Sequence, residues 1–219
     1  MTRRTATTIT VATLAVVAVL GLTACDPGTP KPTGSKTPSP TATSTPTAST
    51  TDRPMPPKAD APKDADSAIA AAKSTYAAYL DVQLNFLKNL KLGPQYLSGY
   101  VLQGSPAWTV LTDTADKSTE SPVKSGGPIV WTSNDAMAYA SQTTNAADGT
   151  KLEFGSVHLF GCSDNSKIEF TNPAIPKGSS PYKVVLVYVS ETHSWMIQED
   201  LQMRPSDGEA MPQCCSRRA

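Results

Sequence analysis

The pattern of hydrophobic and polar positions divides the chain into three parts. An uncharged, largely apolar stretch follows Arg3 and Arg4 and runs to Ala24. Between residues 26 and 63 hydrophobic residues almost vanish, and Pro, Thr and Ser dominate. Beyond residue 63 hydrophobic residues recur first at three- and four-residue steps and later at two-residue steps. The first period is that of a helix and the second that of a strand, so this third part predicts helices followed by a sheet.

The helical pattern is clearest over residues 67–91. Asp64 or Asp66 precedes it as a candidate N-cap, and Gly93-Pro94 is expected to end it. The segment lacks Gly and Pro and is rich in Ala, which favours a helix. Its apolar residues form one stripe: Ile69, Ala72, Tyr76, Tyr79, Leu80, Leu84, Leu87 and Leu90.

Weaker helical patterns follow at residues 96–100 and 106–116, where short helices are expected. In the second of these the side chains expected to face inward are Ala107, Val110 and Leu111. Residues 118–128, which include Gly126-Gly127-Pro128, then indicate a loop.

The first strands are expected at residues 129–131 and 137–141. Asp148-Gly149 predicts a hairpin turn that leads into a longer strand over residues 152–162. The alternation of apolar residues changes phase within that strand, which predicts a bulge at Gly155-Ser156.

Two more strands are expected after a Pro/Gly-rich loop at residues 172–181. Residues 182–189 are apolar on both faces, as in a central strand. In the last strand, apolar residues alternate with polar ones: Trp195, Ile197, Leu201 and Met203 against Gln198, Asp200 and Gln202. That pattern predicts one face in the core and one face in water.

The apolar stretch near the N-terminus is typical of a secretory signal peptide. It is too short for a permanent membrane-spanning helix, which needs about 20 residues. Leu22-Thr23-Ala24-Cys25 closely resembles the lipoprotein signal-peptide pattern. That resemblance implies cleavage before Cys25 and attachment of lipid chains, palmitate among them, to this cysteine. An ordinary secretory signal and a retained signal-anchor helix are the alternatives.

The Pro/Thr/Ser-rich segment that follows is too polar to form a core, so it is expected to be a disordered tether. Its prolines favour a stiff, extended conformation, which at about 3.1 Å per residue reaches at most roughly 120 Å. The expected organisation is a signal peptide (residues 1–24), lipidated cysteine and tether (25–63), folded domain (64–205) and C-terminal tail with a cysteine pair (206–219).

Helices followed by strands predict an α+β fold, with N-terminal helices packed on a curved, mainly antiparallel sheet. Residues 67–203 resemble the NTF2-like (cystatin-like α+β roll) domains of actinobacterial secreted lipoproteins. The resemblance is carried by the Ala/Tyr-rich helix at residues 69–90, by Cys162-Ser163-Asp164-Asn165-Ser166, and by the final hairpin with Trp195. A Cys-X-Asp-X-Ser segment and a later cysteine recur in such proteins. The long loop at residues 118–128 and the second terminal cysteine depart from that pattern.

Three cysteines remain once Cys25 is assigned to the anchor. Outside the cytoplasm pairing is expected, and we predict a disulfide from Cys162 to either Cys214 or Cys215. The third cysteine is then free, bridges two molecules, or joins its neighbour in a vicinal disulfide. A metal site is disfavoured because the chain has no Cys-X-X-Cys pair and no nearby His.

Composition excludes several classes of function. The chain has 19 basic and 19 acidic residues and no basic cluster, which disfavours nucleic-acid binding. Two histidines make a multi-histidine metal site improbable, and no cofactor is predicted. Nothing matches a serine-hydrolase elbow, a phosphate loop or a zinc signature.

The remaining candidates for chemistry each have a simpler structural interpretation. His158 is a possible general base with Glu153 or Glu199 as partner, but a structural or solvent-facing histidine is favoured. His193 is expected in an exposed turn. Asp164 and Ser166 more closely suit a turn capped by the Asp side chain than a nucleophile pair.

The same holds for the glycines and tryptophans. Gly126-Gly127 precede Pro128 rather than a helix start with free N–H groups, which disfavours an anion site. Of the three tryptophans that could line a ligand pocket, Trp108, Trp131 and Trp195, the last is expected in the core.

The sequence thus favours a non-catalytic lipoprotein, anchored at the outer face of the cytoplasmic membrane, that binds an envelope protein or a small ligand. The alternative is an extracytoplasmic enzyme that uses His158 for acid–base chemistry in the concave pocket the resemblance implies. A third hypothesis is an accessory or exclusion factor encoded by a phage or mobile element.

Overall fold

The computed structural model describes residues 53–118, 120–144, 149–208 and 210–214. The predicted signal peptide, Cys25, most of the predicted tether, Asp148 of the predicted hairpin turn and Cys215 lie outside these residues. Within the described ranges, none of the helices has the length and apolar character needed to cross a membrane.

The first element is the long helix α1 (Ala65–Lys88), as the periodicity predicts. The Asp64 carboxylate accepts a hydrogen bond of 2.7 Å from the Ser67 backbone N–H, so Asp64 is the N-cap. The helix ends at Lys88 and its C-cap is Asn89, four residues before the expected Gly93. Two single-turn helices, η2 (Leu90–Leu92) and η3 (Pro94–Leu97), carry the chain onward.

The second helix, α2 (Pro106–Lys117), also lies where the sequence predicts it. Ser105 caps its start by accepting a hydrogen bond from the Trp108 N–H, and Pro106 occupies the first turn. Ala107 and Leu111 are buried, but Val110 is 52% exposed, so its predicted inward orientation is wrong. Because α2 covers only the side of the core formed by the last strand, β7 (Ser194–Gln202), a narrower apolar stripe is sufficient.

The larger sheet has five antiparallel strands. Its strands are β2 (Val130–Ser133), β3 (Tyr139–Thr144), β4 (Lys151–Asp164), β6 (Ser179–Val189) and β7 (Ser194–Gln202). The order is β2-β4-β6-β7, and β3 pairs with the other half of the long strand β4. β6 is therefore a central strand, which confirms the interpretation of its apolar pattern.

A second, two-stranded sheet pairs β1 (Val123–Gly126) with β5 (Ile168–Phe170). β1 lies inside the segment predicted to be a loop, residues 118–128. Only one of its residues, Val123, is buried, so β1 carries no alternating pattern that could have indicated a strand. A final turn of helix, η4 (Pro205–Asp207), follows the larger sheet.

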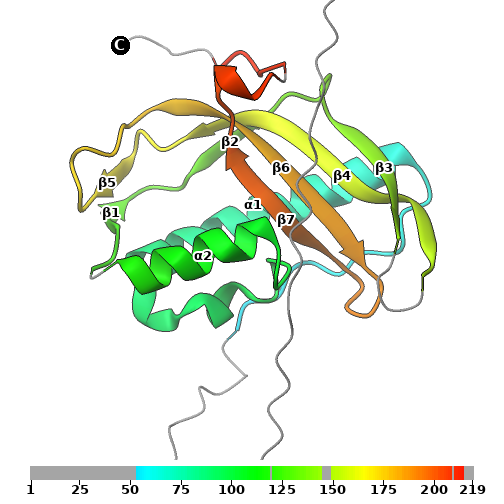
Figure 1. Cartoon of the computed structure of the whole chain (residues 1–219), viewed down its shortest axis with the longest axis horizontal. Coiled ribbons are helices and arrows are strands. Elements are labelled where there is room, and N and C mark those ends of the chain that lie inside the picture. The colour runs from blue at the N-terminus through cyan, green and yellow to red at the C-terminus, as the bar shows by residue number, and fades with distance from the viewer. Residues whose placement is uncertain (1–52, 119, 145–148, 209, 215–219) are drawn as a thin grey trace, which may run out of the picture. The chain divides into compact units, whose positions relative to one another are not determined.

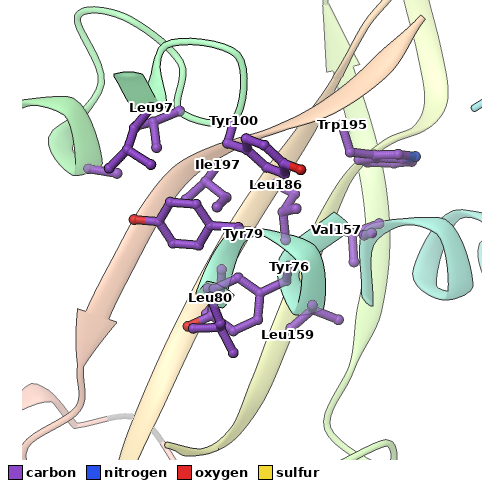
Figure 2. Packing of buried hydrophobic residues seen from close by; sticks show 14 of the residues in the cluster. Tyr76, Tyr79, Leu80, Leu97, Tyr100, Val157, Leu159, Leu186, Trp195 and Ile197 are labelled. Carbon is purple, nitrogen blue, oxygen red and sulfur yellow. The ribbon is translucent and has the colours of Figure 1, made fainter. Parts of the chain in front are cut away.

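The core lies between α1 and one face of the larger sheet, so the predicted α+β class is confirmed. Figure 1 shows α1 crossing the strands of this sheet and the β1/β5 pair at one end, while α2 packs against β7 and η3. The Tyr76 and Tyr79 rings project from α1 toward the strands, where they meet Leu186 and Ile197 (Figure 2). Trp195 is fully buried, as expected.

A bulge in β7 reverses which of its side chains face the core. Val185 of β6 pairs with Glu199, but the next residue, Leu186, pairs with Ile197, so Gln198 is an extra residue in β7. Beyond Gln198 the even-numbered residues Asp200 and Gln202 lie on the face toward α1, and Glu199 and Leu201 lie on the opposite face. Leu201 is consequently 41% exposed, and the predicted alternation is wrong for this half of the strand.

The predicted bulge in β4 is confirmed. Ser141 of β3 pairs with Ser156, whereas Thr143 pairs with Leu152, so the ladder slips within the stretch that contains Gly155. A side chain at Gly155 would overlap Thr143 and Leu152, which explains why glycine occupies this position.

The last part of the predicted tether is attached to the domain. We call residues 53–63 the strap. The Tyr188 hydroxyl donates to the Ala59 carbonyl (3.0 Å), and the Ala59 N–H donates to the His193 carbonyl (2.9 Å). Tyr100 donates to the Met55 carbonyl at 3.0 Å. The expectation that the disordered tether extends to residue 63 is therefore wrong. The backbone of the strap forms hydrogen bonds with Tyr100, Tyr188 and His193, and the sequence of the strap did not indicate these partners.

Candidate functional site

A cavity of about 230 Å³ lies between α1, the larger sheet and the β1/β5 pair. Much of its wall is apolar, with Leu80, Leu84 and Leu87 from α1 and Val123, Ile168 and Phe170 from the β1/β5 pair. The sheet supplies polar groups at its other side: Tyr182 from β6 and Asp200 from β7. An apolar pocket with a few polar groups is the usual form of a small-molecule site.

Asp200 reaches this cavity because of the bulge at Gln198, which turns it toward α1. The Tyr76 hydroxyl donates to Oδ1 of Asp200 at 3.2 Å. Asp200 is half-buried and forms no ion pair with any residue of the described ranges. Burial raises the pKa of its carboxyl to about 6, although the Tyr76 hydrogen bond acts in the opposite direction. The sequence had placed Asp200 on a solvent-facing side of the strand, and that expectation is wrong.

Three tyrosines surround the Asp200 carboxylate. Burial, with the nearby Asp200 charge, holds the pKa of Tyr76 and of Tyr79 well above the usual range. The same two causes raise the pKa of Tyr182. All three hydroxyls therefore stay protonated at neutral pH, and the Tyr76 hydroxyl is the one that donates to Asp200. The cavity thus combines largely apolar walls with one carboxylate and the neutral hydroxyls of Tyr76 and Tyr182.

Trp131 supports the tyrosine that holds Asp200. Its ring packs edge-on against Tyr76, with 5.0 Å between ring centroids and an interplanar angle of 80°. The ring lies over Gly161 of β4, where any side chain would overlap it. None of the three tryptophans lines the cavity itself, so the idea of a tryptophan-lined pocket does not apply to this site.

His158 does not line the cavity. Its neighbours Val157 and Leu159 are in the core, so His158 lies on the opposite face of the sheet, where it stacks on Tyr139 with 4.4 Å between ring centroids. The candidate partner Glu199 is two strands away, because Val185 lies between them in the ladder. Strands are about 4.8 Å apart, so the two side chains start about 10 Å from each other. Glu153 is exposed. The structure therefore does not bring His158 and Glu199 together in this cavity.

The simpler interpretations of the other polar residues are confirmed. The Asp164 carboxylate accepts a 2.8 Å hydrogen bond from the Ser166 N–H, which closes a turn and lowers the pKa of Asp164. His193 is an exposed turn residue with φ of 49°. The Gly127 N–H donates to the Lys167 carbonyl at 3.1 Å and is not available to an anion.

The expected disulfide joins Cys162 to Cys214, with 5.5 Å between the Cα atoms. It fixes the tail to the face of the sheet that points away from α1, since Cys162 and the core residue Leu159 are an odd number of positions apart. The described residues contain no group of His, Cys, Asp and Glu side chains that could hold a metal ion.

No family model, curated protein or solved structure matches this chain.

Proposed function

We propose that this protein is a lipid-anchored, extracytoplasmic binding protein whose NTF2-like domain holds a small ligand in the cavity beside Asp200. The observation that carries the proposal is a cavity of about 230 Å³ with largely apolar walls and a carboxylate that has no charged partner among the described residues. A dry cavity of about 150 Å³ already accommodates benzene, so this one suits a molecule of roughly one ring with a short polar group.

The anchor is proposed on the sequence of residues 22–25. Two acyl chains hold a protein stably on a membrane, which would place the domain at the outer face of the cytoplasmic membrane. Because the strap is bound to the domain, the spacer is shorter than the composition suggests and comprises residues 26–52. At about 3.1 Å per residue such a spacer reaches about 84 Å at most. The domain would then sample ligands in the cell-wall layer near the membrane.

The cavity is tested by filling it. Ile175 lies in the loop after β5 and lines the cavity, while its exposed neighbour Ala174 does not. We expect Ile175→Trp to weaken fragment binding at least fivefold, measured by ligand-observed NMR on the full chain in detergent, with micelles alone as the blank. Ala174→Trp is the matched control and retains binding. Fragments that bind all three proteins equally would show that the cavity is not the site.

The anchor has its own test. Cells that express the full chain are fed an alkyne-bearing fatty acid, and we expect Cys25 to carry the label. Cys25→Ala should abolish labelling and release the protein from the membrane fraction. Labelling that survives in this variant would exclude Cys25 as the lipidated residue.

A second candidate function is catalysis of a proton transfer by Asp200. A carboxyl whose pKa is about 6, next to the Tyr76 donor in an apolar cavity, suits a general base better than His158 does. If Asp200 acts in this way, a bound ligand with a C–H group next to a carbonyl should exchange that hydrogen in D₂O. Asp200→Asn should stop the exchange, and binding without any exchange would favour the non-catalytic function.

A further inference from the structure

We infer that the cavity selects an organic cation: a small aromatic or aliphatic group that carries a protonated amine. This inference rests on the proposed function and specifies its ligand class. It is carried by the position of Asp200 at the polar side of a largely apolar cavity, and by the lack of an ion-pair partner for Asp200 among the described residues.

The carboxylate has one unused oxygen. Oδ1 accepts the hydrogen bond from Tyr76, but Oδ2 accepts none from a described residue. A protein pays a large free-energy penalty for an ionised carboxylate in apolar surroundings unless a charge or hydrogen-bond donor pairs with it. A primary ammonium on the ligand would supply both, because it is a cation with three donors. A neutral ligand would leave the penalty in place.

The aromatic side chains of the cavity favour the same class of ligand. Tyr76, Tyr182 and Phe170 all line it, from α1, β6 and β5 respectively. Aromatic rings attract cations through the negative charge of their faces, and the attraction is stronger where water is excluded. Two amide side chains also line the cavity, and both already have partners. Gln83 forms a hydrogen bond with Tyr79, while Asn165 accepts from the Gly178 N–H at 2.7 Å and donates to the Pro176 carbonyl at 3.3 Å.

The surroundings of Asp200 also determine how binding depends on pH. The titratable groups that face it are Tyr76 and Tyr79 from α1 and Tyr182 from β6, and burial raises the pKa of each above the usual tyrosine range. Asp200 is therefore the group of this site that changes charge in the mildly acidic range. A cation should bind well at pH 7.5 and weaken as the pH falls below about 6.

The test compares three ligands of one shape on the full chain in detergent: benzylamine, benzyl alcohol and benzoate. We expect benzylamine to bind at least tenfold more tightly than benzyl alcohol at pH 7.5, because hydrogen bonds to charged groups are the stronger ones. Benzoate should bind most weakly, through repulsion by Asp200. Equal affinity for benzylamine and benzyl alcohol, or tighter benzoate binding, would overturn the inference.

Asp200→Asn separates charge from shape. The amide has nearly the same size, so we expect at least a tenfold loss of benzylamine affinity and no loss of benzyl alcohol affinity. One outcome separates the two proposals. If benzyl alcohol binds the wild type but not the Ile175→Trp variant, and benzylamine binds the wild type no more tightly than benzyl alcohol, the cavity is a binding site and only the ligand class is wrong. If none of the three ligands binds, the proposed function fails together with this inference. Circular dichroism of each variant checks that the fold is retained.

Discussion

The Tyr76 hydroxyl donates a hydrogen bond to the Asp200 carboxylate at 3.2 Å, which joins the middle of α1 to the end of β7 over 124 positions of sequence. This contact places a carboxylate at the polar side of an apolar cavity, where it has no ion-pair partner among the described residues. The protein thus keeps a charge in a position that costs stability, as binding sites often do.

The pH dependence of stability should reveal that cost. Because the pKa of Asp200 is about 6 in the folded protein and 3.8 is its ordinary value, the folded state holds the proton more tightly than the unfolded state. Stability should therefore fall as the pH rises from about 4 to about 6. Asp200→Asn removes the contribution of this titration to the free energy of unfolding. We therefore expect the substitution to raise the free energy of unfolding by about 2 kcal/mol more at pH 7.5 than at pH 4.

Urea unfolding of wild type and Asp200→Asn at both pH values gives this difference. The pKa values of Asp64, Asp135 and Asp164 are lowered by hydrogen bonds, so these groups lose stabilising interactions in acid. They do so equally in both proteins and cancel in the comparison. An effect of Asp200→Asn that is the same at pH 4 and pH 7.5 would contradict the assigned environment.

The disulfide should contribute strongly to stability. Cys162 and Cys214 are 52 positions apart, and closing a loop of this length contributes about 4 kcal/mol in the chain-entropy model. We expect the double variant Cys162→Ala/Cys214→Ala to lose about that much in urea unfolding. A non-reducing digest should yield a peptide that links Cys162 to Cys214, and a link from Cys162 to Cys215 instead would show that the assignment is wrong.

The attachment of the strap can be tested at Gly99. A Cβ at this position would lie 2.9 Å from the Pro54 carbonyl oxygen, so Gly99→Ala should push the strap away from the domain. We expect faster tryptic cleavage after Lys58, whose ammonium donates to the Thr192 carbonyl at 2.8 Å. Gly127→Ala is the matched control, because its Cβ would lie 3.5 Å from its nearest neighbours, an ordinary contact. Equal cleavage in both variants would mean that the strap is not held at this point.

A side chain at Gly161 should destabilise the protein, because the Trp131 ring packs directly against this glycine. A Cβ at Gly161 would overlap both the Trp131 ring and the Thr132 carbonyl oxygen. Since Trp131 packs against Tyr76, displacement of the ring should disturb the cavity as well as the fold. We expect Gly161→Ala to cost about 1–3 kcal/mol in urea unfolding and to weaken fragment binding. A fully stable variant with unchanged binding would show that Trp131 does not position Tyr76.

The sequence predicted the elements with strong periodicity and missed features that arise from pairing between distant segments. α1 was predicted because its apolar stripe and its Asp64 cap are local signals. The bulge at Gln198 left no local signal, since Trp195, Ile197 and Leu201 continue the alternation in the sequence while the strand has already changed phase. That single residue is the reason why Asp200 was placed in water.

Two other differences have the same origin. The strap is polar and rich in proline, and its backbone hydrogen bonds to Tyr100, Tyr188 and His193 depend on residues far along the chain. β1 pairs with β5 through only a few residues, too short a stretch to set a period. The cavity is formed by α1, the β1/β5 pair and the end of β7, so it could not be recognised before these segments were brought together.

The most direct test of the binding site is a pH titration of the Asp200 carboxyl carbon by NMR, in the full chain, with and without saturating benzylamine. We expect a pKa of about 6 without ligand, because burial raises it, and a clearly lower pKa with benzylamine, because the ammonium stabilises the charged form. A pKa near 3.8 that benzylamine does not change would contradict both the buried carboxylate and its role in binding a cation.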